Sequence, residues 1–240
     1  MIKPDVVVCW PTNCDYPLWR LFIRENRDRF NFVYVVFTEH SSKITYDNFV
    51  TEQMVNDNVS LIRSPEVEAE QDWRDVAIKS ALAHSQSEWV WFTEQDFYPT
   101  EEFWGNVDYY VENDCNVIAV YQEKRMHPCC IFIKREILDS LNPYFGIVPD
   151  KLDHFGKLQQ ELEQRDDVKI GILDSKNYYH YNGLSHNWRL ITDGMPPNYK
   201  PEEFLRYLGA CLDSIIKKHP IFTEIAIRSI NAYLPQKEGK

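Results

Sequence analysis

The chain has 240 residues and a formal net charge of −11 at pH 7, and 44% of its residues are hydrophobic. This composition can supply a buried core, which excludes a disordered chain. No apolar stretch reaches the roughly 18 residues that a membrane-spanning helix needs. The negative charge argues against nonspecific nucleic-acid binding, because such binding requires Lys and Arg to neutralise phosphates.

The six cysteines and the first residues bear on the cellular compartment. There is no CxxC pair, and adjacent Cys129 and Cys130 are a poor arrangement for zinc. We therefore expect reduced thiols without a functional role. Residues 1–5 lack the character of a signal or transit peptide and lead directly into a strand pattern, so a cytoplasmic protein is expected.

The first hundred residues alternate between apolar runs typical of buried strands and spacings typical of amphipathic helices. We expect strands at 5–10, 32–38, 59–62 and 89–93, and helices at 16–29, 72–84 and 100–111. This alternation predicts parallel βαβ units in an α/β fold. Further strands are expected at 117–121, 130–133 and 169–173, and further helices at 134–141, 153–165, 201–219 and 221–233.

The apolar run at 89–92 is followed within a few residues by two carboxylates, Glu94 and Asp96. Two residues apart in an extended chain, both side chains point to the same side. The carboxyl ends of strands in an α/β sheet are where ligands usually bind. Hard oxygen ligands at such a position suit a divalent cation that carries a diphosphate, although acidic residues also follow strands as ordinary turn formers.

With this order of strands, helix and acidic strand end, the chain resembles GT-A glycosyltransferases. The resemblance covers about residues 5–188 and implies a Rossmann-like, mixed but mainly parallel sheet flanked by helices. We assign 1–192 to this catalytic domain and 193–240 to a C-terminal helical extension packed on it. Such enzymes hold a metal through an Asp-x-Asp motif, here Glu94-Gln95-Asp96, in which Asp96 would ligate the metal directly.

A second resemblance lies near residue 180, where the chain is similar to the His-x-x-Gly-x-x-Lys-Pro-Trp motif of glycogenin-like and bacterial galactosyl enzymes. His180, Gly183 and Trp188 match the motif, whereas His186 replaces the Lys and Asn187 replaces the Pro. The resemblance implies that His180 completes the metal site and that His186 meets the diphosphate. Imidazole together with carboxylates suits Mn²⁺, whereas a site built of oxygen alone favours Mg²⁺.

Two further segments are candidates for contacts to the donor. Arg74 and Asp75 open the helix expected at 72–84, and a helix N-terminus beside an Arg is a natural anion site. Pro11, Thr12 and Asn13 follow the first strand, and in the resembling family this loop contacts the nucleotide. A plain capped helix and a plain turn remain the alternative interpretations of these two segments.

The candidate catalytic base is Asp153, which opens the helix expected at 153–165. Inverting relatives carry a carboxylate at about this point in the chain order, and it deprotonates the acceptor hydroxyl. Asp150 is a second candidate, and His154 could assist the acceptor. An ordinary helix cap at Asp153 is the alternative.

The sequence thus predicts a metal-dependent glycosyltransferase that uses Mn²⁺ or Mg²⁺ and a nucleotide-sugar donor, with a UDP-sugar expected. A non-catalytic binding protein with the same fold is one alternative. Another is a glycosyltransferase that acts on a modified nucleic-acid base. Nucleotidyltransferases share the architecture, but they need a glycine-rich loop after the first strand, and residues 10–14 contain no glycine.

Overall fold

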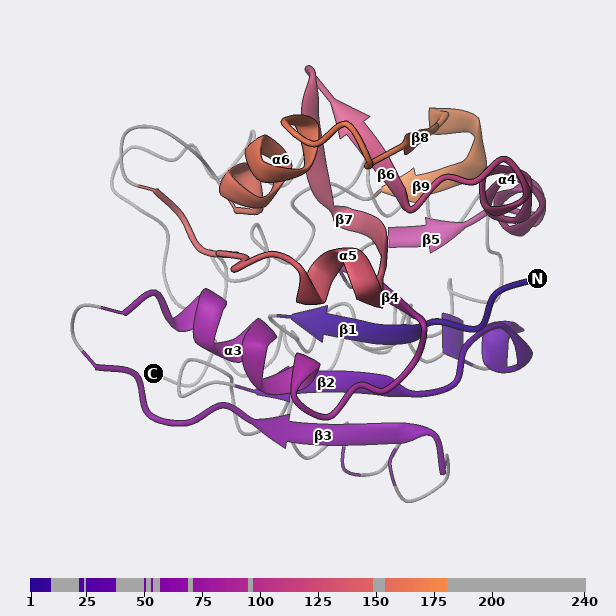
Figure 1. Ribbon diagram of the computed structural model, residues 1–240. Helices are drawn as coiled ribbons and strands as arrows, with labels where there is room; N and C mark the ends of the chain where they lie inside the picture. The colour runs from indigo at the N-terminus through magenta and orange to yellow at the C-terminus, as the bar shows by residue number, and fades with distance from the viewer. Residues whose placement is uncertain are drawn as a thin grey trace, which may run out of the picture.

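The computed structural model describes residues 1–9, 22–23, 25–37, 50, 53, 57–68, 71–94, 97–148 and 154–180. Seven of its strands form one sheet in the order β3-β2-β1-β4-β7-β6-β8, and β5 and β9 form a separate two-stranded sheet (Figure 1). The strands are β1 (Asp5–Cys9), β2 (Val33–Phe37), β3 (Val59–Arg63), β4 (Trp89–Thr93), β5 (Phe97–Pro99), β6 (Val117–Gln122), β7 (Arg125–Lys134), β8 (Ile170–Leu173) and β9 (Tyr178–His180).

The large sheet is mixed but mainly parallel, as the sequence predicts. β1 runs parallel to both β2 and β4, β2 runs parallel to β3, and β6 runs parallel to β8. Only β7 is antiparallel to its neighbours, β4 and β6. The carboxyl ends of β1, β2, β3 and β4 therefore share one edge of the sheet, which is the edge where ligands bind in α/β folds.

Helices cover the sheet on both faces. α3 (Trp73–Leu82), α5 (Arg135–Asp139) and α6 (Gly156–Glu163) pack on one face, and α4 (Glu101–Glu112) packs on the other (Figure 1). Residues 22–23 and 25–26 are helical and lead into the short 3-10 turns η1 (Arg27–Arg29); a second such turn, η2 (Ser175–Asn177), precedes β9. None of the helices in the described ranges is both long and apolar enough to cross a membrane.

Each strand contributes alternate side chains to two separate cores, because successive residues of a strand face opposite sides. In β4, Trp91 lies in the core beneath α4, and Phe92 lies in the core beneath α3 and α6. Both side chains are essentially inaccessible to solvent. A strand buried on both faces explains the continuous apolar run at 89–92, in which no polar residue alternates.

The observed elements differ from the expected ones chiefly at β5, β7, β9 and α6. β7 begins at Arg125 rather than at residue 130, because its first half contains polar residues and a proline that hide a strand pattern. β5 and β9 were not expected, since each has only three residues. α6 begins at Gly156 with Phe155 at the N-cap position, rather than at residue 153, and Asp153 itself lies outside the described residues. The helices expected at 201–219 and 221–233, and the extension 193–240, lie outside the described residues.

Asp5 provides a test of the buried polar contacts that join β1 to the turn before β4. Its carboxylate accepts hydrogen bonds from the Ser85 hydroxyl at 2.8 Å and from the amides of Gln86 at 2.9 Å and Ser87 at 3.1 Å. Asp5→Ala leaves these donors without their acceptor, and we expect the free energy of unfolding to fall by about 3 kcal/mol.

Urea denaturation measures this loss, and Asp139→Ala is the control. Asp139 is largely exposed, and within the described residues its side chain forms a 3.7 Å ion pair with Arg135, so its removal should cost under about 1 kcal/mol. Equal effects of the two substitutions would contradict the structural role given to Asp5.

Candidate functional site

The site lies at the carboxyl edge of the sheet, where β4 ends and Glu94 follows. The backbone here is held by β7, since the amide of Glu94 donates to the carbonyl of Cys129 at 3.4 Å and the Thr93 hydroxyl donates to the same carbonyl at 2.9 Å. The Glu94 side chain remains partly exposed. The Glu94 carboxylate thus lies at the edge of the sheet, directly after a strand that is buried on both faces.

The two-stranded sheet brings together two distant segments that carry candidate ligands. β5 pairs with β9 in antiparallel fashion, and Phe97 lies opposite His180 in the register. Phe97 directly follows Asp96 in the chain, and the amide of Phe97 donates to the carbonyl of Glu94 at 3.4 Å. The backbone of His180 is therefore brought next to the end of the acidic motif. Asp96 itself and the side chain of His180 lie outside the described part of the structure.

His127 is a residue of the site that the sequence did not indicate. It is buried in β7, and its Nδ1 lies 3.9 Å from a carboxylate oxygen of Glu94. The amide of Cys129 donates to the same nitrogen at 3.2 Å, which fixes the orientation of the ring. The antiparallel pairing of β4 with β7 brings His127 to Glu94, and a long-range strand pairing of this kind leaves no local signal in the sequence.

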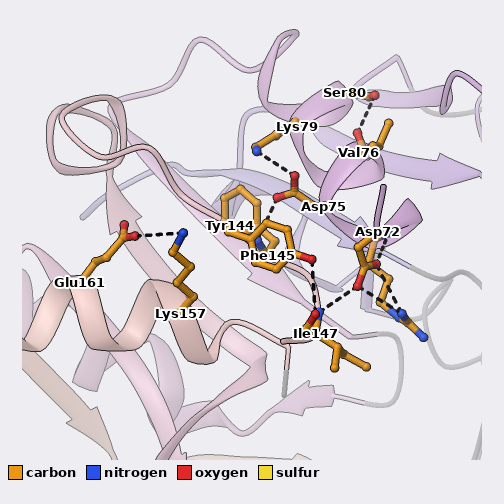
Figure 2. A network of polar contacts seen from close by, with 11 residues as sticks. Asp72, Asp75, Val76, Lys79, Ser80, Tyr144, Phe145, Ile147, Lys157 and Glu161 are labelled. Atoms are coloured by element: carbon orange, nitrogen blue, oxygen red, sulfur yellow. Dashed lines mark hydrogen bonds and ion pairs between the residues drawn. The ribbon is translucent and has the colours of Figure 1, made fainter. Parts of the chain in front are cut away.

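The start of α3 faces the same edge of the sheet. Asp72 caps the helix by accepting from the amide of Arg74 at 2.9 Å, and its other carboxylate oxygen accepts from the amide of Ile147 at 2.8 Å (Figure 2). Arg74 stacks over the ring of Trp73 at 4.6 Å and pairs with Asp72 at 3.4 Å. The guanidinium is thus held beside the first turn of the helix, where backbone amides favour an anion.

Asp75 lies one turn further along α3 and is nearly buried. One of its oxygens accepts from the amide of Phe145 at 2.9 Å, and the other accepts from the Lys79 ammonium at 2.7 Å (Figure 2). A carboxylate has about four lone-pair positions, so these contacts leave room for a further donor. The contacts show that Asp75 joins α3 to the segment after α5.

The remaining sequence candidates are outside the described residues. They are Pro11, Thr12, Asn13, Asp150, Asp153 and His186, together with Asp96. His154 is described and lies in the turn before α6. In the described residues no group of three or more His, Cys, Asp or Glu side chains is placed to hold a metal ion. The structure thus brings the backbone of His180 next to the segment that follows Glu94, and α3 begins on the same side of the sheet.

Comparison with solved structures identifies the fold. The mannosyltransferase PcManGT from Pyrobaculum calidifontis, in complex with GDP-Man and Mn²⁺, is 18% identical, with 99% of this chain and 82% of that chain covered and a TM-score of 0.51. Glucosyl-3-phosphoglycerate synthase from Mycobacterium tuberculosis, in complex with Mn²⁺, UDP and phosphoglyceric acid, is 13% identical, with coverages of 82% and 80% and a TM-score of 0.54.

A third solved structure with this fold is 4-diphosphocytidyl-2C-methyl-D-erythritol synthase from Anaerococcus prevotii. It is 9% identical, with 87% of this chain and 96% of that chain covered and a TM-score of 0.52. No family model matches the sequence, and no curated protein matches it significantly. At these identities the comparisons establish the fold: the chain has the mixed, mainly parallel GT-A architecture that the sequence predicts.

The charge of Asp72 makes the stability of the fold depend on pH in a way that can be tested. Burial raises the pKa of its carboxyl, but the hydrogen bonds from the amides of Ile147 and Arg74, together with the charge of Arg74, outweigh burial and hold the pKa below the ordinary 3.8. A lowered pKa in the folded state stabilises the fold above the unfolded-state pKa, and this contribution is lost as the pH falls through the folded-state pKa.

We therefore expect Asp72→Asn to lower the free energy of unfolding by about 2 kcal/mol near neutral pH. The gap between parent and variant should close as the pH falls below about 4. Urea unfolding curves at a series of pH values measure it. A gap that stays constant from neutral to acid pH would show that the Asp72 charge does not stabilise the fold.

Proposed function

We propose that this protein is a metal-dependent glycosyltransferase that moves a sugar from a nucleotide-sugar donor to an acceptor hydroxyl. A UDP-sugar is the proposed donor, and Mn²⁺, or Mg²⁺ in its place, is the proposed metal. The fold supports the proposal, since two of the compared structures are a mannosyltransferase and a glucosyl-3-phosphoglycerate synthase, both solved with Mn²⁺ and a nucleotide ligand. Their sugar, nucleotide and acceptor are properties of those proteins.

One observation on this chain supports the proposal most directly. β5 follows the acidic motif and pairs with β9, which ends in His180. The segments 97–99 and 178–180, which are far apart in the sequence, thereby lie next to each other beside Glu94. Asp96 and His180 are the proposed metal ligands. A carboxylate and an imidazole together form a donor set that suits Mn²⁺.

Each remaining candidate has a proposed part in holding the donor. The bound metal would supply charge neutralisation for the departing nucleoside diphosphate. Arg74 and His186 are proposed to donate hydrogen bonds to the diphosphate, and Asp75 to face the sugar from the start of α3. Glu94 is proposed to complete the acidic motif, and His127 of β7 lies 3.9 Å from its carboxylate. Pro11, Thr12 and Asn13 are proposed to contact the nucleoside.

The metal assignment predicts the behaviour of Asp96→Ala. In the parent protein, a nucleoside diphosphate with Mn²⁺ should raise the melting temperature, because a ligand that binds only the folded state stabilises it by mass action. Asp96→Ala should lose this Mn²⁺-dependent increase while its melting temperature without ligand stays near that of the parent. A thermal-shift series with and without Mn²⁺ measures both quantities.

Asp139→Ala, an exposed carboxylate on α5, serves as the matched control and should respond to ligand like the parent. If Asp96→Ala binds metal and nucleotide as the parent does, Asp96 is not a ligand. If no nucleoside diphosphate stabilises the parent with either metal, the proposed function itself is wrong.

Asp153 is proposed as the base of an inverting reaction. The alternative role of Asp153 is that of a helix cap, and the structure gives Phe155 as the N-cap of α6. Asp153→Asn keeps the shape of the side chain and removes its basicity, so turnover should fall by about 10²–10⁴-fold while donor affinity survives.

Release of nucleoside diphosphate with an acceptor measures turnover, and NMR of the product gives its anomeric configuration. Asn caps helices nearly as well as Asp, so a purely capping residue would tolerate the substitution. A retained configuration, or turnover near that of the parent, would remove Asp153 from the mechanism.

Nucleotidyl transfer is the second candidate, and the fold shared with the synthase from Anaerococcus prevotii favours it. Residues 10–14 contain no glycine, however, whereas this chemistry needs a glycine-rich phosphate loop after the first strand. The leaving group separates the two reactions. Glycosyl transfer releases a nucleoside diphosphate from a nucleotide sugar, whereas nucleotidyl transfer releases pyrophosphate from a nucleoside triphosphate, and assays for the two products decide between them.

A further inference from the structure

The segment 144–147 lies across the first turn of α3 and is held there by two carboxylates. The amides of Phe145 and Ile147, two residues apart, donate to Asp75 and Asp72, which are three residues apart on the helix (Figure 2). Residues three apart on a helix share a face. Alternate amides of a segment can therefore meet both carboxylates at once, and we call these two hydrogen bonds the clamp.

Gly146, between the two clamped amides, leaves no space for a side chain. A Cβ atom at this position would lie 2.6 Å from Cγ and Oδ2 of Asp72 and 2.7 Å from the hydroxyl of Tyr144. Contacts this short require the segment or the carboxylate to move. The close approach of the segment to Asp72 thus depends on a glycine at residue 146.

The core fixes the clamped segment from its other side. The ring of Phe145 is fully buried. Its centroid lies 5.4 Å from that of the Phe92 ring in β4 and 5.3 Å from that of the Phe155 ring before α6. The backbone of residue 145 is therefore anchored both by a carboxylate on α3 and by a ring in the core. Such a double anchor leaves the segment little freedom to drift relative to the helix.

Asp72 also holds the guanidinium of Arg74, so one carboxylate serves the clamp and the candidate anion site together. Its Oδ1 accepts from the Arg74 amide and pairs with the guanidinium, and its Oδ2 accepts from Ile147. The side chain of Asp72 is only 11% exposed, and that of Arg74 is 28% exposed. The buried carboxylate therefore orients a more accessible cation.

We propose that Asp72 is a positioning residue for the diphosphate of the donor: through the clamp and its contact with Arg74, it fixes the guanidinium against the segment 144–147. This inference rests on the proposed function. It concerns a residue that does not itself touch the donor, because its oxygens face Arg74 and Ile147. Asp75 supports the same arrangement from the next turn of α3.

Asp72→Asn tests the proposal because it changes only part of what Asp72 does. The amide oxygen of Asn can still cap α3, but an NH₂ group replaces the oxygen that accepts from Ile147, and the pairing charge for Arg74 is lost. Titration calorimetry with uridine diphosphate and with guanosine diphosphate, each with Mn²⁺, measures the affinity. Uridine and guanosine measure the nucleoside contribution alone.

The proposal predicts that Asp72→Asn weakens binding of the nucleoside diphosphate by about tenfold, the effect of losing one charge-assisted hydrogen bond, and leaves nucleoside binding unchanged. Simple electrostatics predicts the opposite sign, because removing a negative charge beside the site should strengthen the binding of an anion. The two explanations are thus separated by the direction of the change. Hydrogen exchange at the amides of Phe145 and Ile147 should also become faster.

Asp167→Asn is the matched control. Asp167 makes a 2.6 Å ion pair with Arg165 on the exposed surface, so its loss should alter neither affinity nor exchange at the clamp. Gly146→Ala keeps both carboxylates and displaces the segment, and it should give the same loss of diphosphate affinity; it replaces Asp72→Asn if that variant does not fold.

Three results would overturn the proposal or its basis. If the parent binds neither diphosphate with Mn²⁺, the proposed function fails and this inference fails with it. If the parent binds but Asp72→Asn binds equally well or better, the clamp is a structural contact only. An equal loss for nucleoside and diphosphate would show a general disturbance of the site and would also exclude the positioning role.

Discussion

The rest of the structure depends on the burial of β4 on both of its faces. Trp91 stacks on Phe132 of β7 at 4.8 Å within one core, and Phe92 lies 5.3 Å from Phe155 within the other. Because neighbouring residues of a strand face opposite sides, one strand joins both cores. Truncating either ring would leave a cavity that the dense interior cannot close. β4 ends at Thr93, directly before Glu94, so the burial of the strand fixes the backbone from which the Glu94 side chain extends.

The position of β4 in the sheet determines what surrounds Glu94. On one side it pairs with parallel β1, and on the other with antiparallel β7. The parallel neighbour brings its carboxyl end to the site, whereas the antiparallel neighbour brings its amino-terminal half. This change of direction explains why a buried imidazole, His127, lies beside a strand-end carboxylate. The same edge receives β9 through its pairing with β5, which joins a third segment to the site.

The sequence predicted the elements whose signal is local. Buried strands such as β4 appear as apolar runs, and Asp72 caps α3 where the pattern placed the helix start. It did not predict the first half of β7, because Pro128 and polar residues interrupt the apolar pattern where the register with β4 has ended and β6 is the paired strand. Contacts between distant segments were also missed: the pairing of β5 with β9, the approach of His127 to Glu94, and the hydrogen bonds from residues 145 and 147 to α3. Each depends on tertiary packing, which leaves no periodic trace in the chain.

Phe155 has a strained backbone conformation that packing in the core imposes. Its φ of 61° is a left-handed conformation that is costly for a bulky residue, and such conformations persist only where the surroundings impose them. Here the imposing contacts are the rings of Phe92 and Phe145. Phe145 is in turn tied to α3 through Asp75. Phe145 after α5 and Phe155 before α6 therefore pack against the same ring on β4, the strand that directly precedes Glu94. The segment that contacts α3 and the start of α6 thus share one buried support on β4.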